Sequence, residues 1–214
     1  MMINAANNAI QDFVVSEYQH TNITFIEQNS VIAKIPGTDP NAGTIIIGAH
    51  LDSINLENKN NAPGADDDAS GVAVLIETIR NIASSKAQFR HDIEFHAYAA
   101  EEVGLVGSRD IAEAYNTQNK KIAAMMQLDM VSWSSDPSDT TIYLVENDTS
   151  SNLRREVKNL LTAYLNGNYG EMALKAGTSD HKSWNSLGFK PSFLSNILSI
   201  ITKHFIQKTI PSIQ

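Results

Sequence analysis

The order of apolar and polar positions predicts a chain in which strands alternate with helices. Residues 44–48 form a short uncharged run rich in β-branched side chains, which predicts a buried strand. Apolar residues between Val72 and Ile82 recur at helical spacing, which predicts a helix that begins near Asp68 to Ser70. Further strands are predicted at 23–27, 31–35, 93–100, 123–128 and 141–145, and further helices at 6–14, 108–115 and 150–165.

This alternation predicts an α/β fold built as a three-layer sandwich, with a mostly parallel central sheet between helices. A length of 214 residues and a hydrophobic content of 42% are typical of one globular domain. We therefore expect a single domain over residues 1–214.

The charge balance and the missing residue types exclude several functions. The net charge of −8 argues against nucleic acid as a partner, because phosphate binding needs a basic surface. No apolar run reaches the roughly 18 to 20 residues of a membrane span, and the amino terminus does not resemble a signal peptide. The chain has no cysteine, so any metal site must use nitrogen and oxygen ligands.

Acidic and imidazole side chains follow three of the predicted strands. His50 and Asp52 follow the first, Glu101 and Glu102 the second, and Asp129 the third. Because ligand sites in open α/β sheets gather at the carboxyl ends of strands, we expect these groups to meet in one crevice. Three consecutive aspartates, 66–68, precede the helix after the first strand and add to this charge.

Carboxylates and an imidazole in one crevice repel or titrate unless a cation joins them, which predicts a divalent metal site. The surplus of carboxylates suits two ions that share a bridging aspartate. Each residue also has an ordinary structural explanation: His50 as a buried histidine, the aspartates as a turn and helix cap, and Glu101 and Glu102 as a solvated loop. Their common position at strand ends favours the metal site.

Five motifs in this order resemble the two-zinc aminopeptidases of the bacterial leucyl aminopeptidase type. They are HLDS, APGADDDASG, AYAAEEVGLVGS, QLDM and SDHKSW, and the resemblance extends from about residue 3 to about residue 193. It implies a zinc exopeptidase with a phosphorylase/hydrolase-like sandwich fold. Such an enzyme is secreted and removes the first residue, preferably a large apolar one such as leucine, from a peptide with a free amino terminus.

The resemblance also implies a role for each residue of the crevice. His50 and Asp129 would bind one zinc ion, Glu102 the other, and Asp67 would bridge the two. Asp52 would orient the His50 ring, and Glu101 would be the general base. A cis peptide bond between Asp67 and Asp68 is expected, and Met130 is expected to form an apolar wall.

The chain departs from the family pattern towards its end. No tyrosine lies in residues 175–178, just before the SDHKSW motif, where the family has one. The tail at 194–214 lacks the family's second-zinc histidine, and His204 is not expected to replace it. We hypothesise that a frameshift produced this tail, which the nucleotide sequence of the gene would test. The second zinc site is therefore expected to be weak.

Two other classes of function remain open. A truncated, catalytically impaired relative would bind metal without efficient turnover. A calcium-binding module could use the aspartates at 66–68, but it would leave His50 without a role, because calcium prefers oxygen ligands.

Overall fold

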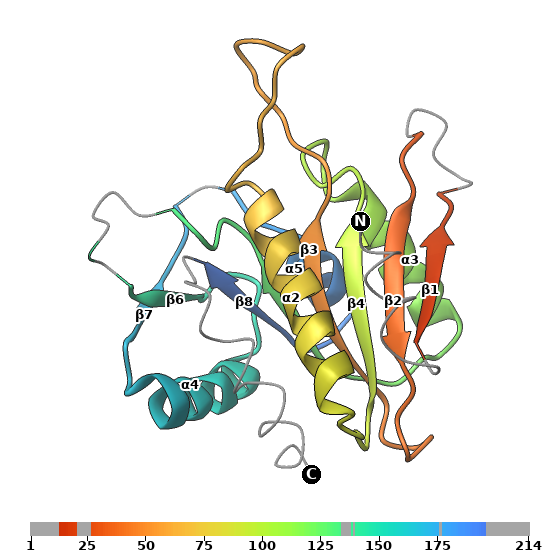
Figure 1. The fold of residues 1–214 in the computed structure, drawn as a ribbon. Coiled ribbons are helices and arrows are strands. Elements are labelled where there is room, and N and C mark those ends of the chain that lie inside the picture. Colours follow the sequence, from red (N-terminus) through yellow and green to blue (C-terminus); the bar gives the residue numbers. More distant parts are fainter. Residues whose placement is uncertain (1–12, 21–26, 134–137, 139, 176, 196–214) are drawn as a thin grey trace.

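The computed structural model describes residues 13–20, 27–133, 138, 140–175 and 177–195. These residues form one eight-stranded sheet in the order β1-β2-β4-β3-β5-β8-β6-β7 (Figure 1). The strands are β1 (Val14–Tyr18), β2 (Ser30–Ile35), β3 (Thr44–His50), β4 (Asp92–Tyr98), β5 (Ile122–Leu128), β6 (Ile142–Val145), β7 (Tyr169–Met172) and β8 (Pro191–Ser195). The helices are α2 (Ala69–Ser85), α3 (Val106–Thr117), α4 (Ser151–Leu165) and α5 (His181–Ser186).

The four central strands are parallel, and the outer pairings are mixed. Strand β3 pairs in parallel with β4 and with β5, and β5 pairs in parallel with β8. Strands β1 and β2 form an antiparallel edge next to β4, and β6 is antiparallel to β8. This arrangement confirms the predicted α/β class with a mostly parallel sheet.

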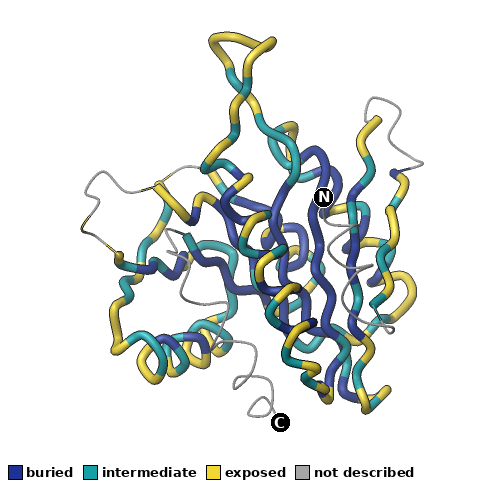
Figure 2. Tube along the Cα trace, viewed as in Figure 1, coloured by how far each residue is buried: buried dark blue, intermediate teal, exposed yellow. Residues whose placement is uncertain are grey.

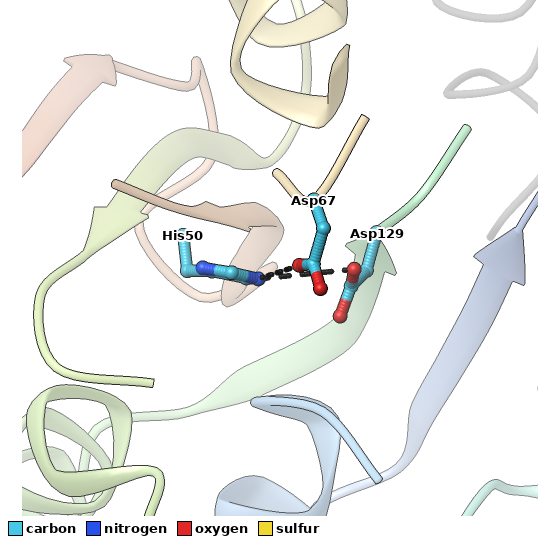
Figure 3. A group of neighbouring side chains, drawn as sticks. All are labelled: His50, Asp67 and Asp129. Carbon is cyan, nitrogen blue, oxygen red and sulfur yellow. Dashed lines mark ion pairs between the residues drawn. The ribbon is translucent and has the colours of Figure 1, made fainter. Parts of the chain in front are cut away.

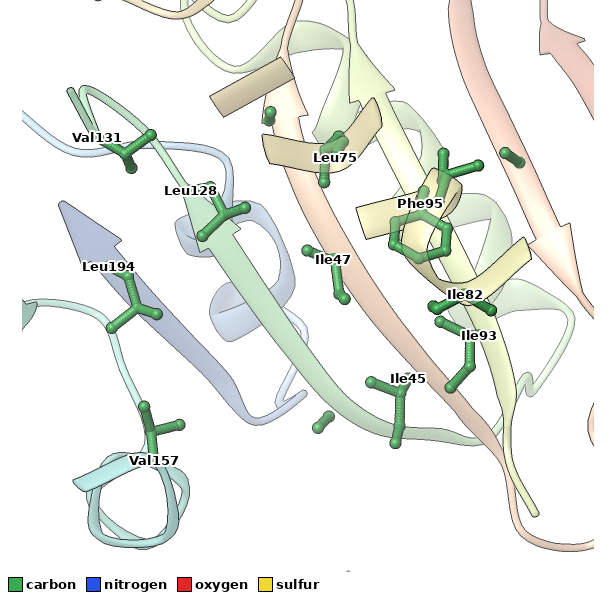
Figure 4. Close-up of a cluster of buried hydrophobic side chains, with 14 of the residues drawn as sticks. Ile45, Ile47, Leu75, Ile82, Ile93, Phe95, Leu128, Val131, Val157 and Leu194 are labelled. Atoms are coloured by element: carbon green, nitrogen blue, oxygen red, sulfur yellow. The ribbon is translucent and has the colours of Figure 1, made fainter. Parts of the chain in front are cut away.

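Helices cover both faces of the sheet, which makes three layers. Leu75, Ile79 and Ile82 of α2 pack with α4 and one sheet face in a cluster that Figure 4 shows. On the other face, Trp184 of α5 packs with α3 in a second cluster. Both clusters are buried, as the dark central strands of Figure 2 show. The polar residues that alternate along β4 are therefore buried as well, because α3 lies over their face.

The prediction of a first helix over residues 6–14 is wrong at its carboxyl end. Val14 begins strand β1, which pairs with β2 along its whole length, so pairing at the sheet edge prevails over the helical spacing. The other residues of that helix up to position 12, and most of the predicted strand at 23–27, lie outside the described residues. The sequence also gave no prediction for β7, α5 and β8. Within the described residues, no helix combines the length and the apolar character that a membrane crossing requires.

Candidate metal centre

Three neighbouring parallel strands end at the same edge of the sheet and carry the predicted site. His50 is the last residue of β3, Asp129 directly follows β5, and Glu101 lies three residues after β4. Since β3 lies between β4 and β5, the imidazole is flanked by the two acidic strand ends. Figure 3 shows His50, Asp67 and Asp129 pointing toward one another.

The His50 ring is held so that one nitrogen faces the acidic groups. Its Nδ1 lies 2.9 Å from the backbone carbonyl of Asp52, so Nδ1 carries the hydrogen and donates it. Nε2 lies 3.0 Å from Asp67 Oδ1 and 3.8 Å from Asp129 Oδ1, and in the neutral ring it carries the lone pair that a metal ion would bind. It is buried and has no aligned hydrogen-bond partner. A lone pair between two carboxylates is suited to a cation.

The three consecutive aspartates have different functions in the structure. Asp68 accepts hydrogen bonds from the backbone amides of His50 and Gly71 at 3.0 Å each, and thereby caps α2. Asp66 accepts hydrogen bonds from the loop after β5. Asp67 alone turns its carboxylate to His50. The structure contains the expected cis peptide bond between Asp67 and Asp68.

Within the described residues, His50, Asp67 and Asp129 form the group that could hold a metal ion, here called the metal group, and their candidate ligand atoms all lie within 4.8 Å of one another. The group offers one imidazole nitrogen and carboxylate oxygens, a donor set that zinc and similar divalent ions accept. Together with the unpartnered Nε2, this donor set fits a divalent ion. Glu102, the fourth predicted ligand, is not in the group: its Oε1 accepts a hydrogen bond from the Ile54 amide at 3.2 Å.

Asp52 supports the site in two ways, of which the sequence predicted one. The predicted orienting contact with His50 is made by its backbone carbonyl, while its carboxylate lies farther from Nδ1, at 3.7 Å. That carboxylate instead accepts hydrogen bonds from the amides of Glu101 and Glu102, at 3.0 and 3.1 Å. Asp52 therefore joins the end of β3 to the loop that carries both glutamates.

The site holds more negative charge than its own side chains neutralise. Burial, followed by the charge of Asp180, raises the pKa of Glu101 to about 8. Burial and Asp129 raise the pKa of Asp68 to about 9. Burial opposes the protonation of His50, but the surrounding aspartates outweigh it and raise the pKa of His50. Among the described residues, no lysine or arginine forms an ion pair with these groups.

Asp180 is a buried acid of this region for which the sequence pattern predicted no role. It is fully buried; its Oδ2 accepts a hydrogen bond from Gln127 at 3.2 Å, and its Oδ1 has no partner. Burial raises its pKa to about 7. The motif SDHKSW contained this residue, but a single aspartate before a short helix resembles an ordinary cap, so only the fold reveals that it is buried.

The unusual tail is described only at its beginning. Leu194 and Ser195 complete β8, and Leu194 is fully buried, so these two residues belong to the fold. His204 lies outside the described residues. All the other residues of the tail, 196–214, lie outside them as well.

The sequence matches the profile of peptidase family M28 over residues 30–206. A probable leucine aminopeptidase of the fungus Arthroderma benhamiae is 38% identical over 175 residues, which are 79% of this chain and 46% of that protein. A probable aminopeptidase of Saccharomyces cerevisiae is 36% identical over 193 residues, which are 87% of this chain and 52% of that protein. The chain thus spans about half the length of these curated relatives.

Solved structures give the same result for the fold. LapB of Legionella pneumophila superimposes with a TM-score of 0.82 at 32% identity, covering 91% of this chain and 51% of LapB. A zinc aminopeptidase of Bacillus subtilis superimposes with a TM-score of 0.65 at 23% identity, covering 78% of this chain and 40% of that one. The profile match over most of the chain identifies it as a member of peptidase family M28.

Proposed function

We propose that this chain is the metal-binding domain of a zinc aminopeptidase, which removes the first residue from peptides with a free amino terminus and prefers large apolar residues such as leucine. The observation that carries the proposal is the buried, unpartnered His50 Nε2 between the carboxylates of Asp67 and Asp129. The names of the fungal relatives support the substrate class. By the same resemblance we propose that the protein acts outside the cell, which assay of culture medium against cell extract would test.

The residues around the metal group have separate tasks. A bound zinc ion would polarise the scissile carbonyl and make a bound water more acidic. Glu101, which is held at its backbone amide by Asp52, is the general base that takes the proton of the water and passes it to the leaving amine. Burial and the charge of Asp180 raise the pKa of Glu101, and the charge of a bound dication would lower it again, which favours the carboxylate that a general base requires.

We further propose unequal binding of two ions. His50, Asp67 and Asp129 would hold the first, while Asp67 and Glu102 would hold the second more weakly. The position of Glu102 supports weaker binding of the second ion, because its carboxylate accepts a hydrogen bond from the Ile54 amide and is not turned to the metal group. Elemental analysis after dialysis is expected to find one tightly bound zinc ion per chain. Two tightly bound ions would refute this part of the proposal.

Hydrolysis of a chromogenic leucine anilide tests the activity. We expect turnover that a chelator abolishes and zinc restores. Glu101→Gln should retain zinc and lower kcat by at least ~100-fold, because it removes general base catalysis. Glu57→Gln, the same charge change in an exposed loop, is the matched control. Zinc binding without turnover in the unsubstituted chain would support the alternative, a catalytically impaired relative, for which the position of Glu102 is the structural argument.

A further inference from the structure

Outside the metal group, a largely buried chain of hydrogen bonds joins a histidine, an aspartate and a serine. His20, two residues after β1, has its Nδ1 2.9 Å from Asp110 Oδ2 on α3, and its Nε2 lies 2.8 Å from the Oγ of Ser30 at the start of β2. A carboxylate only accepts hydrogen bonds, so Nδ1 carries the hydrogen, and Nε2 of the neutral ring accepts that of the Ser30 hydroxyl. We call these three residues the His20 triad.

The same three residue types form the nucleophile, base and acid of serine hydrolases, but the His20 triad is not arranged for that chemistry. Ser30 is fully buried, and its Oγ already accepts a hydrogen bond from the Ala99 backbone amide at 2.9 Å. A serine nucleophile must reach a substrate carbonyl, whereas this hydroxyl is enclosed by its own chain. The triad therefore ends on a backbone amide and not on a substrate.

The amide that Ser30 accepts lies two residues before Glu101, the proposed general base. Between them, Ala100 has a φ of +57°, a left-handed conformation that residues other than glycine keep only where their neighbours fix it. On the far side of Ala100, the Glu101 amide donates to Asp52 Oδ1 at 3.0 Å. Ser30 and Asp52 thus hold the strained residue from both sides.

Helix α3 is joined to the same turn at two points. Near its start, the Gly107 amide donates to the Ala99 carbonyl at 3.1 Å. A Cβ at position 107 would lie 2.1 Å from that carbonyl oxygen, so only glycine permits this approach. Three residues farther along the helix, Asp110 reaches the Ala99 amide through the other two residues of the triad. The carbonyl and the amide of Ala99 are therefore both fixed relative to α3.

We propose that the His20 triad positions Glu101 for proton transfer, because it fixes the Ala99 amide and with it the turn from which the glutamate emerges. This inference rests on the proposed aminopeptidase function and adds to it positioning residues on the sheet edge and on α3. Loss of the Ser30 hydroxyl should impair proton transfer more than substrate binding, because a displaced general base loses rate without the removal of a binding contact.

Kinetics with leucine anilide tests the positioning role. Ser30→Ala should lower kcat about 10-fold and leave KM and zinc affinity within about 2-fold, because a small displacement of the base affects the chemical step. Ile79→Val, a loss of packing in α2 on the opposite face of the sheet, is the control for lost stability and should keep kcat. Equal kcat values of the two variants would overturn the proposal, as would a loss of zinc affinity as large as the loss of kcat.

A double variant tests whether Asp110 acts through Ser30. Asp110→Ala should lower kcat about 3-fold, the order of one hydrogen bond, because the His20 ring loses the acceptor that orients it. In the Ser30→Ala background it should have no further effect, since residues that act in one chain are not additive. Glu113→Ala, an exposed acid of the same helix, is the matched control. Additive losses would overturn the proposal. If Ser30→Ala does not fold, unchanged kcat in Asp110→Ala would overturn it.

Hydrogen exchange in the metal-free chain tests the triad without turnover. Ser30→Ala should speed exchange at the amides of Glu101 and Glu102 at least ~10-fold relative to the rest of the chain, although both keep Asp52 as their acceptor. Ile79→Val should not. If the unsubstituted chain cleaves no peptide, the proposed function fails, and this exchange still decides whether the triad holds the turn. If it cleaves leucine anilide and Ser30→Ala changes neither exchange nor kcat, the positioning role fails alone.

Discussion

Two groups of buried charges in this protein use the same residue types with opposite results. The first is the metal group with its neighbouring acids. The second, here the Glu94 cluster, lies where α3 covers β4 and consists of Glu94, His96, Tyr115 and Lys120. Both groups place a histidine beside a carboxylate inside the sandwich. They differ in whether the chain supplies a lysine in addition to the histidine.

The carboxylate of the Glu94 cluster is fully partnered. It accepts hydrogen bonds from His96 Nε2 at 3.1 Å, the Tyr115 hydroxyl at 2.9 Å and Lys120 Nζ at 2.8 Å. Burial by itself would raise the pKa of Glu94, but the histidine and lysine outweigh it and hold this pKa at about 2. Charge is therefore neutralised internally here, and the cluster needs no ligand.

Among the described residues, no lysine or arginine pairs with the metal group, and its neighbouring acids have raised pKa values. The comparison teaches that a histidine and a carboxylate together do not identify a metal site. The informative sign is acid in excess of the cations that the chain provides. Four predictions test this difference, from the largest expected effect to the smallest.

Replacing Glu94 should damage the fold most. Glu94→Ala leaves Lys120, Tyr115 and His96 without their shared acceptor, and we expect a loss of about 3 kcal/mol in the free energy of unfolding. Denaturant titration measures it. Glu113→Ala, the same substitution at an exposed position of α3, should change stability by less than ~0.5 kcal/mol. Equal effects of the two variants would contradict internal neutralisation.

Replacing Asp67 should damage metal binding and spare the fold. Asp67→Asn removes one ligand of the metal group, and zinc affinity should fall at least ~100-fold, about 2.7 kcal/mol. In chelator its melting temperature should stay close to that of the unsubstituted chain, because the lost contact with His50 Nε2 is offset by the removal of one of several neighbouring acids. Competition with a fluorescent zinc chelator measures the affinity, with Glu57→Gln as control. A lower melting temperature in chelator would contradict the prediction.

The two groups should respond oppositely to pH. Asp180 has a pKa of about 7 in the fold and near 3.8 when unfolded, so the native state keeps a proton that the unfolded state loses between these values. Metal-free stability should therefore fall by a few kcal/mol as pH rises from 4 to 8, and the raised pKa values of Glu101 and Asp68 add to this fall. Asp180→Asn should remove the part of this fall that Asp180 causes and so make the pH curve shallower, whereas parallel pH curves for the two proteins would disprove its contribution. Stability from Glu94, whose pKa is lowered, is present above pH 4.5 and lost as pH falls toward 2.

The smallest effect is expected at the margin of the Glu94 cluster. Lys34 Nζ lies 3.9 Å from Glu94 Oε1 and its side chain is 35% exposed, whereas Lys120 is closer and less exposed. Lys34→Met should cost less than ~1 kcal/mol, because exposed ion pairs contribute little. Lys120→Met should cost more. The reverse order, measured by thermal unfolding, would show that proximity does not determine which lysine neutralises Glu94.

The sequence predicted the central architecture well and the edges poorly. Strand β3 was recognisable as an uncharged run rich in β-branched residues, and β4 by the alternation of apolar and polar residues. Strand β5 was recognisable as a short apolar run. Val14 was assigned to a helix because a few apolar residues at helical spacing cannot reveal that β2 offers an edge for pairing. Strand β8 was not predicted, although Leu194 is fully buried, because this short strand begins at a proline and its last two residues belong to the tail with no matching pattern.

For the site, the sequence alone determined which strands end beside acids and an imidazole. The apolar pattern of each strand stops at or shortly before His50, Glu101 or Asp129. Only the tertiary structure decided which of them meet. Asp66, Asp67 and Asp68 are equivalent in sequence, yet one anchors a loop, one faces His50 and one caps a helix. The physical reason is that side-chain direction depends on the backbone path through the turn, and partners distant in sequence come within reach only when the strands lie side by side.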